Sequence, residues 1–344
     1  SIVVSIVLGT GEAASIFLIV CLTLFYTFEG GMTAVIWTDV IQMVIYVGGA
    51  IVSLFVILDH IPGGWSHVTE VASAAGKFQV FDFRFAPTME FFSRTYTFWA
   101  GVLGGCFLTT ASHGTEQLMV QRLLAARSET ESRTALFASW AVIFFQFSLF
   151  LIIGVILFVY YRDSGLPPPN PPDRIYPEFI WKYLPTGVAG LVIAAVLAAA
   201  MSNLSAALNS LASTTVMDFV KPMSKGERSD AQWLRLARLT TLVWGGVLFG
   251  IAVLAQGVRS VLEAGLSIAS VVYGSLLGVF LLGVLTRRVQ ERAAMFGMLV
   301  GFLVMIFVRF ATPVAWTWYV LIGSSATFAS AYLASLALRE EHNG

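Results

Sequence analysis

Charge is what this sequence has least of. Only 12% of its 344 residues are Asp, Glu, Lys or Arg, about half the fraction of an average soluble domain. The net charge is zero and there is no basic run, which excludes the usual electrostatic footprint of a nucleic-acid-binding protein. With 57% hydrophobic residues and a mean hydropathy of +0.81, the composition is typical of a polytopic membrane protein.

Cysteine is scarce as well. Cys21 and Cys106 both lie in apolar segments, so the sequence indicates neither a disulfide framework nor a metal cluster. The chain begins with Ser1 in "SIVVSIVLG", without an initiator Met or the basic start of a signal peptide. We therefore expect a fragment of a longer chain, with residues 1–9 the end of an earlier membrane span.

Long apolar runs, in contrast, are abundant. A helix needs about 20 apolar residues to cross roughly 30 Å of hydrocarbon. The sequence predicts spans near residues 12–28, 32–58, 96–123, 133–161, 186–219, 233–256, 261–284, 291–310 and 314–337. Basic residues between spans three and four, five and six, and seven and eight predict cytoplasmic loops and a cytoplasmic C-terminus. The predicted location is the plasma or inner cell membrane, with loop 59–95 outside.

Span five contains more oxygen than a lipid-facing helix needs. In "LAAAMSNLSAALNSLAST", residues 197–214, Ser202, Ser205, Asn209 and Ser213 recur at i, i+3, i+7 and i+11, which predicts one helical face. Small residues and hydroxyls of this kind also let membrane helices pack closely. The spacing alone therefore leaves packing and binding open.

A more specific pattern lies at the start of this stretch. On a helix the carbonyl of Ala199 lies near the side chains three and four residues later, which are Ser202 and Asn203. Together they form a small group of oxygens suited to a hard monovalent cation. The remaining ligands would have to come from another helix.

Asp39, in "AVIWTDVIQMVIYV", lies near the cytoplasmic end of span two. A carboxylate within the membrane costs at least about 2.5 kcal/mol. One interpretation is a helix-end carboxylate that reaches the water of the headgroups. The other, which we favour because Thr38 and Gln42 make the region polar beyond what a helix end needs, is an acid on an ion pathway.

Span three has the pattern of a broken helix. Four glycines and the polar stretch "TTASHGT" lie at what should be membrane depth. A break there would expose backbone groups to a cavity, as in transporter substrate sites, whereas the glycines also fit close helix packing. Glu116 is expected to form a structural network with Gln121 and Arg122.

Four stretches together resemble the sodium/solute symporter family, which includes sodium-coupled carriers for sugars, proline, pantothenate, iodide and sialic acid. They are "YTFEGGMTAVIWTDVIQ" (26–42), "GTEQLMVQRLLAARS" (114–128), "LPTGVAGLVIAAVLAAAMSNLSAALNSLASTTVMDF" (184–219) and "GVFLLGVLTRRVQERAAMFGMLVG" (278–301). In order and spacing they cover nearly the whole chain.

The resemblance implies a leucine-transporter-type, all-α membrane fold, built from two inverted five-helix repeats whose first helices are broken. Residues 1–58 would then hold the end of the first repeat and 59–95 an extracellular or periplasmic loop. Residues 96–284 would be the second repeat, and 285–344 peripheral helices with a cytoplasmic tail. The broken helix of the first repeat, which supplies part of the sodium site in the family, would lie outside this fragment.

The resemblance also implies sodium ligands. The family's sodium site matches the carbonyl of Ala199 and the side chains of Ser202 and Asn203, where Asn203 replaces a usual Ser. Members with a second sodium site use an acid that matches Asp39, and serines that match Ser202 and Ser205. A further serine of that second site is Ala206 here.

The solute site differs from that of the family's sugar carriers. Their Tyr-Trp pair matches Ser112 and His113, and their Lys and Gln match Ile143 and Leu266. The resemblance therefore argues against a sugar bound in that manner. The polar residues left to face a solute are Thr109, Ser112, His113 and Thr115.

These patterns predict a sodium-coupled secondary active symporter that imports a small organic solute by alternating access. Its partners would be sodium, the solute and membrane lipid, with no nucleic acid, and it would not be an enzyme. The alternative is a sensor module of the same fold, and coupling to protons through His113 or Asp39 stays open. A serine hydrolase based on Ser112 and His113 is disfavoured, because adjacent helical side chains point about 100° apart.

Overall fold

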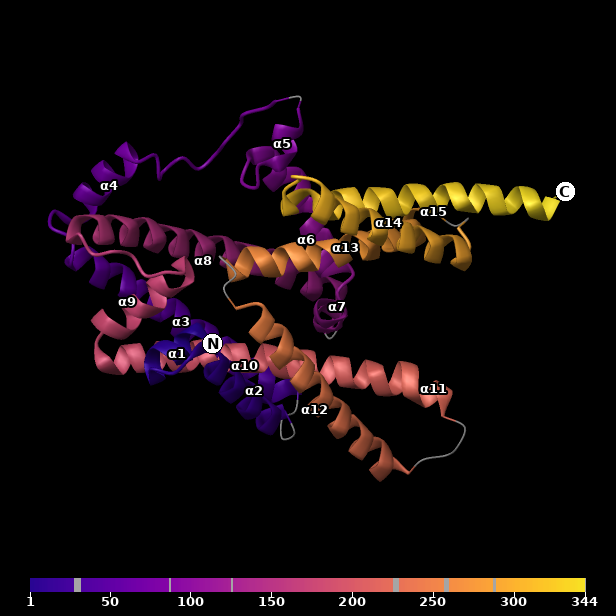
Figure 1. Cartoon of the computed structure of the whole chain (residues 1–344), viewed down its shortest axis with the longest axis horizontal. Helices are drawn as coiled ribbons and strands as arrows, with labels where there is room; N and C mark the ends of the chain where they lie inside the picture. The colour runs from indigo at the N-terminus through magenta and orange to yellow at the C-terminus, as the bar shows by residue number, and fades with distance from the viewer. Residues whose placement is uncertain are drawn as a thin grey trace. The chain divides into compact units, whose positions relative to one another are not determined.

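The computed structural model describes residues 1–27, 32–86, 88–124, 126–224, 229–256, 260–286 and 289–343, and within these ranges the chain is helical and has no β-strand (Figure 1). The helices are α1 Ile2–Leu8, α2 Glu12–Thr27, α3 Met32–Asp59, α4 Gly64–Ala74, α5 Met89–Ser93, α6 Gly105–Gly114, α7 Gln117–Leu124, α8 Glu129–Ser164, α9 Ile175–Tyr183, α10 Thr186–Thr214, α11 Lys221–Met223, α12 Asp230–Leu254, α13 Val261–Leu285, α14 Glu291–Ala311 and α15 Tyr319–Asn343. Four short π or 3-10 turns adjoin them: η1 Ala100–Gly104, η2 Pro172–Arg174, η3 Thr215–Val220 and η4 Trp316–Trp318.

Seven helical stretches in the described ranges are long and apolar enough to cross a membrane, and an eighth is possible if α1 and α2 count as one span bent by 107°. The seven correspond to the predicted spans two and four to nine. Predicted span one, residues 12–28, corresponds to α2, which is described up to Thr27 and follows a turn in which Gly9 has φ 63°, a conformation that glycine adopts without strain. Predicted span three differs because it is divided into η1, α6 and α7.

The chain forms two compact units, each made of two separate stretches of sequence. The first unit contains residues 1–77 and 144–260, and the second contains residues 78–143 and 261–344. The boundary between them falls within α8. Each unit is described by itself below, and the predicted assignment of residues 96–284 to one repeat stays a prediction.

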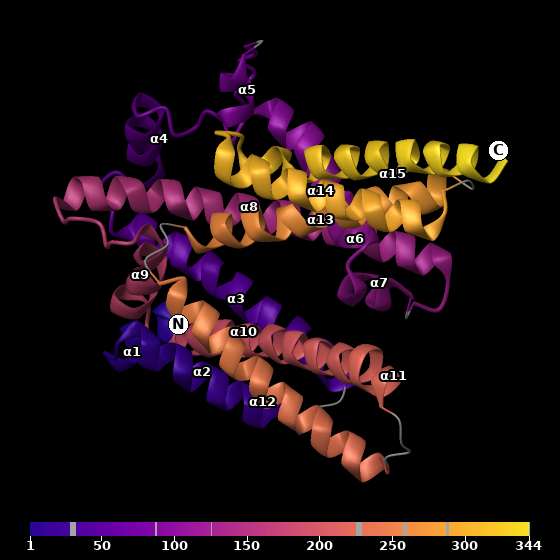
Figure 2. The ribbon, with the colours of Figure 1, turned by 45° about the vertical axis from the view of Figure 1, so that its right-hand side comes forward.

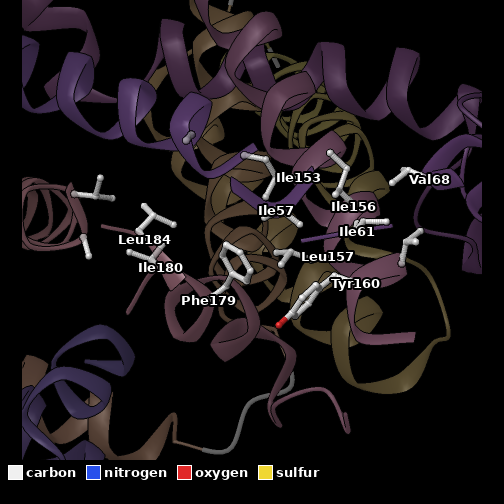
Figure 3. Close-up of a cluster of buried hydrophobic side chains, with 14 of the residues drawn as sticks. Ile57, Ile61, Val68, Ile153, Ile156, Leu157, Tyr160, Phe179, Ile180 and Leu184 are labelled. Carbon is white, nitrogen blue, oxygen red and sulfur yellow. The ribbon is translucent and has the colours of Figure 1, made fainter. Parts of the chain in front are cut away.

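The first unit has its apolar core where the C-terminal end of α3 meets α8 and α9 (Figure 3). The figure shows side chains from these three segments pointing toward one another: Ile57 and Ile61, Ile153, Ile156, Leu157 and Tyr160, and Phe179 and Ile180. The ring of Phe179 stacks on that of Tyr183 at 4.9 Å. This core anchors the C-terminal ends of α3 and α8 and the helix α9 that leads into α10.

In the second unit α13, α14 and α15 lie side by side in both views of the ribbon (Figures 1 and 2). Glycines make the approach possible: a Cβ on Gly278 would lie 2.5 Å from Thr327 Cβ, and one on Gly297 would lie 2.4 Å from Ala331 Cβ. In hydrocarbon there is no hydrophobic gain from burying apolar side chains, so van der Waals contact at close range holds such helices together. The glycines are therefore the structural basis of this three-helix group.

The loop before η1 carries an ion pair. Asp82 accepts hydrogen bonds from Arg84 Nε at 2.8 Å and Nη2 at 2.6 Å. These bonds stabilise the carboxylate and lower its pKa to about 2. Since the Arg84 side chain is largely exposed, the pair orders the loop locally and contributes little to the stability of the fold.

Candidate functional site

The position of α10 against α3 determines which candidate oxygens meet. A Cβ on Gly49 of α3 would lie 2.0 Å from Val192 Cγ2 of α10, so the two helices approach closely there. Ten residues back along α3 and ten forward along α10, the hydroxyl of Ser202 donates to Asp39 Oδ1 at 2.7 Å. The two contacts, about 15 Å apart along each helix, establish that α3 and α10 run antiparallel.

Ser202 and Ser205 are both buried, with 5% and 8% of their surfaces exposed. The hydroxyl of Ser205 lies 2.8 Å from Thr27 Oγ1 at the end of α2. The prediction that Ser205 faces Asp39 beside Ser202 is not met, because Ser202 contacts Asp39 while Ser205 contacts Thr27. The reason is that residues three apart on a helix differ by about 60° around its axis, so one serine faces α3 and the other faces α2.

The remaining oxygens of this stretch do not share the buried face. Asn209 and Ser213 are exposed, although their spacing predicts the face of Ser202. The antiparallel register explains this for Asn209, because seven residues beyond the contact of Ser202 with Asp39 it reaches the level of Met32, where α3 begins. Periodicity in α10 alone does not record where the neighbouring helix begins.

Ala199 and Asn203 form a local pair. The side-chain amide of Asn203 donates to the carbonyl of Ala199 at 3.1 Å, and Asn203 is exposed. Ala199, Ser202 and Asn203 therefore lie within one turn of α10, with Ser202 toward α3 and Asn203 away from it. A cation at this turn would take the carbonyl oxygen of Ala199 in place of the amide hydrogen bond.

The predicted break in span three is confirmed. Helix α6 ends at Gly114 and α7 begins at Gln117. Thr115 caps the end of α6 with its side chain, because Oγ1 donates to the carbonyl of Ala111 at 2.7 Å. Of the four glycines of this span, a Cβ would meet a neighbour only at Gly104, 2.0 Å from the carbonyl oxygen of Thr317, so close packing explains one glycine and not the other three.

The candidate solute residues lie together on the last turn and a half of α6. Thr109 is exposed, while Ser112, His113 and Thr115 are half-buried. Ser112 Oγ lies 2.9 Å from His113 Nδ1, and both atoms also lie within 3.2 Å of the Thr109 carbonyl. The expectation that two adjacent helical side chains would not pair is thus wrong here, because the hydroxyl and the ring both bend back toward the same carbonyl.

The structure also adds partners that the sequence did not indicate. Glu116, in the break between α6 and α7, accepts a hydrogen bond from Tyr273 Oη of α13 at 2.8 Å. The expected network with Gln121 and Arg122 lies outside the described side chains. No local signal connects Glu116 with a tyrosine 157 residues away, just as none connects Ser205 with Thr27.

Among the described residues no group of three or more His, Cys, Asp or Glu is placed to hold a metal ion. The turn of α10 beside Asp39 offers hydroxyl, carbonyl and carboxylate oxygens, the ligand type that hard cations prefer.

Comparison with known proteins agrees with this chemistry. Residues 2–301 match the model of the sodium:solute symporter family. The chain belongs to this family. It is 31% identical to the sodium/sialic acid symporter SiaT of Proteus mirabilis over 92% of this chain and 64% of the relative. It is 30% identical to human sodium-coupled monocarboxylate transporter 1 over 83% of this chain and 46% of that protein.

A solved structure of a Na+-coupled sialic acid symporter, in a substrate-bound outward-open state, superposes on this chain with a TM-score of 0.78. The match has 26% sequence identity and covers 98% of this chain and 70% of the other. The predicted fold class, an all-helical multi-pass membrane protein of the symporter type, is confirmed. The chain spans about half to two thirds of the length of the relatives that it matches.

These relatives are transporters and not enzymes, so Ser112 and His113 are not a hydrolase pair in this symporter family. Nor do the relatives support the alternative of a sensor module. Sodium is the coupling ion that they share.

Proposed function

We propose that this chain is part of a sodium-coupled symporter that imports a small organic acid by alternating access. The observation that carries the proposal is the 2.7 Å contact between the buried Ser202 and the half-buried Asp39. A carboxylate within a membrane span is costly, and such residues usually bind a cation or carry a proton. A sodium ion here would bind the Asp39 carboxylate and the free lone pairs of the Ser202 hydroxyl.

The same turn of α10 supplies a second group of oxygens on its other side. Ala199 and Asn203 offer a carbonyl and a side-chain amide, and Ser205 with Thr27 lies one turn further on. We assign the ligands of the coupling sodium to Ala199, Ser202 and Asn203, and a second ion or an ion pathway to Asp39 with Ser202, since Ser205 contacts Thr27 on α2 instead. Sodium bound at α10 then raises the affinity for solute by linkage.

The class of solute rests on the relatives and on the residues of α6. Sialic acids and monocarboxylates, which the relatives' names give as their substrates, both carry a carboxylate. The hydroxyls of Thr109, Ser112 and Thr115 and the ring of His113 would donate to such a group after Ser112 and Thr115 turn away from the carbonyls of their own helix. We therefore infer an organic acid, bound where α6 gives way to α7.

Uptake by the full-length protein in proteoliposomes tests the proposal. Labelled sialic acid and a labelled short monocarboxylate would be offered with an inward sodium gradient, and with choline in place of sodium. We expect accumulation of an acid above equilibrium only with sodium, and about 2.3 kcal/mol more driving force for each 100 mV and each charge moved inward. Equal uptake in both media contradicts sodium coupling, and a proton gradient that replaces sodium assigns Asp39 or His113 to protons.

A further inference from the structure

The first unit contains an open cavity of 680 Å³ at the C-terminal end of α8. Its walls come from α8, through Gly154, Phe158, Tyr161 and Arg162, and from the proline-rich segment 168–177 that leads into α9. The walls are almost wholly apolar, with charges only at Arg162 and Asp173. Neither the ion residues of α10 nor the solute residues of α6 belong to this cavity.

The depth of the cavity in the membrane follows from the sequence of α8. No charged residue occurs between Arg133 and Arg162, a distance of about 43 Å along a helix and enough to cross the hydrocarbon. Arg162, preceded by Tyr160 and Tyr161, therefore lies at the headgroup level, where tyrosines and basic residues gather. Gly154 lies about 12 Å deeper, so the cavity extends from the headgroups into the hydrocarbon.

The polar end of the cavity is basic. Arg162 is exposed and, among the described residues, has no hydrogen-bond or ion-pair partner, because the neighbouring Asp163 pairs with His67 at 2.9 Å. Lys77 Nζ lies 4.5 Å from the centre of the Phe158 ring on the cavity wall. Arg162 and Lys77 favour an anionic group at this level, because Asp163 is paired with His67 and Glu178 is paired with Arg174 and Lys182.

The apolar end of the cavity has room for a chain. A Cβ placed on Gly154 would meet nothing within 4 Å. Leu151, three residues before Gly154 and so on the same face of α8, is 69% exposed. The open face of α8 thus continues from Arg162 past Gly154 into the hydrocarbon, in the direction in which an acyl chain runs from its headgroup.

We propose that this cavity binds one membrane glycerophospholipid. Its phosphate lies against Arg162 and Lys77, and one acyl chain lies along α8 over Phe158 and Gly154. A water-soluble anion would use only the basic end and leave the apolar walls uncovered, whereas a phospholipid covers both. The bound lipid would fill the space between α8 and the segment that leads into α9.

Native mass spectrometry of the full-length protein in detergent, titrated with phosphatidylglycerol, tests this inference. We expect Arg162→Gln to weaken binding of one lipid about fivefold, the contribution of one basic residue at a charged membrane surface. Gly154→Leu should weaken it by filling the cavity without changing any charge. Arg133→Gln is the matched control, because this arginine lies at the other end of α8 and pairs with Glu129.

Two further ligands test whether the phosphate and the acyl chains are both needed for binding. Digalactosyldiacylglycerol, which has acyl chains but no phosphate, should bind more weakly than phosphatidylglycerol, and glycerol 3-phosphate should not displace the lipid at equal concentration. Displacement by glycerol 3-phosphate would overturn the proposal in favour of a site for free phosphate esters. Equal lipid binding by the native chain, Arg162→Gln and Gly154→Leu would overturn it altogether.

Discussion

Ser202 shows how the surroundings of one hydroxyl distinguish binding from packing. A serine in a membrane helix commonly bonds to a carbonyl of its own helix, as Thr27 does with Thr23 at 2.7 Å. Ser202 instead donates to a carboxylate on another helix. A packing role requires no acid, so the contact with Asp39 is what makes Ser202 a candidate ion ligand.

Replacing this hydroxyl should change sodium dependence more than folding. We expect Ser202→Ala to raise the sodium concentration for half-maximal transport by about tenfold, because a lost polar contact to a charged group costs about 1.5 kcal/mol. Sodium-dependent uptake by the full-length protein is the measurement, with expression level recorded beside it.

The control for this variant lies on the same helix. Ser213→Ala removes an exposed hydroxyl from α10 and should leave both sodium dependence and expression unchanged. If Ser202→Ala behaves like Ser213→Ala, the hydroxyl serves packing only.

At the scale of the element, α14 depends on glycine for its place beside α15. Gly297 faces both a side chain and the backbone, since a Cβ there would lie 2.4 Å from Ala331 Cβ and 2.7 Å from the carbonyl oxygen of Thr327. Backbone atoms cannot rotate out of the way as the end of a side chain can. The sequence showed these glycines only as apolar, small positions.

We predict that Gly297→Ala destabilises the protein by about 1–3 kcal/mol, the usual cost of overpacking. The midpoint of thermal unfolding in detergent should fall by several degrees. Gly283→Ala in α13 is the matched control, because a Cβ there meets nothing within 4 Å and alanine is the better helix former by about 1 kcal/mol. A lower midpoint for both variants would show that loss of glycine flexibility, and not overlap with α15, is responsible.

At the scale of the whole molecule, orientation in the membrane stays a prediction from the basic loops. Several of the residues behind it, Lys225, Arg228, Arg287 and Arg288, lie outside the described residues. The excess of basic residues in cytoplasmic loops reflects how the chain is inserted into the membrane, and not which helices contact one another in the folded protein. The orientation of the chain in the membrane is therefore best determined by a labelling experiment.

We predict that a cysteine at Thr130, at the start of α8, is cytoplasmic, and that one at Ser66 in α4 is outside. Cys21 and Cys106 are exposed and would be replaced first. In intact cells a membrane-impermeant maleimide should label Ser66→Cys and not Thr130→Cys, and after permeabilisation it should label both. The opposite pattern would reverse the predicted orientation and place the C-terminus outside.

Much of the fold could be predicted because the signals are local. Seven predicted spans reappear as apolar helices of membrane length, and the polar stretch after Thr109 does end a helix, at Gly114. The number of spans was less predictable. The 107° bend between α1 and α2 could not be predicted, since hydropathy does not record a turn at Gly9.

The sequence by itself determined the membrane class, the family and the residues worth testing, because apolar length, polar residues within it and the order of motifs are all properties of the chain. Only the tertiary structure decided which oxygens meet. Ser202 and Asp39 are 163 residues apart, and Ser205 and Thr27 are 178 apart. Because the two serines differ by about 60° around the axis of α10, one faces α3 and the other faces α2. The periodicity of a single helix does not indicate which neighbouring helix lies on which side.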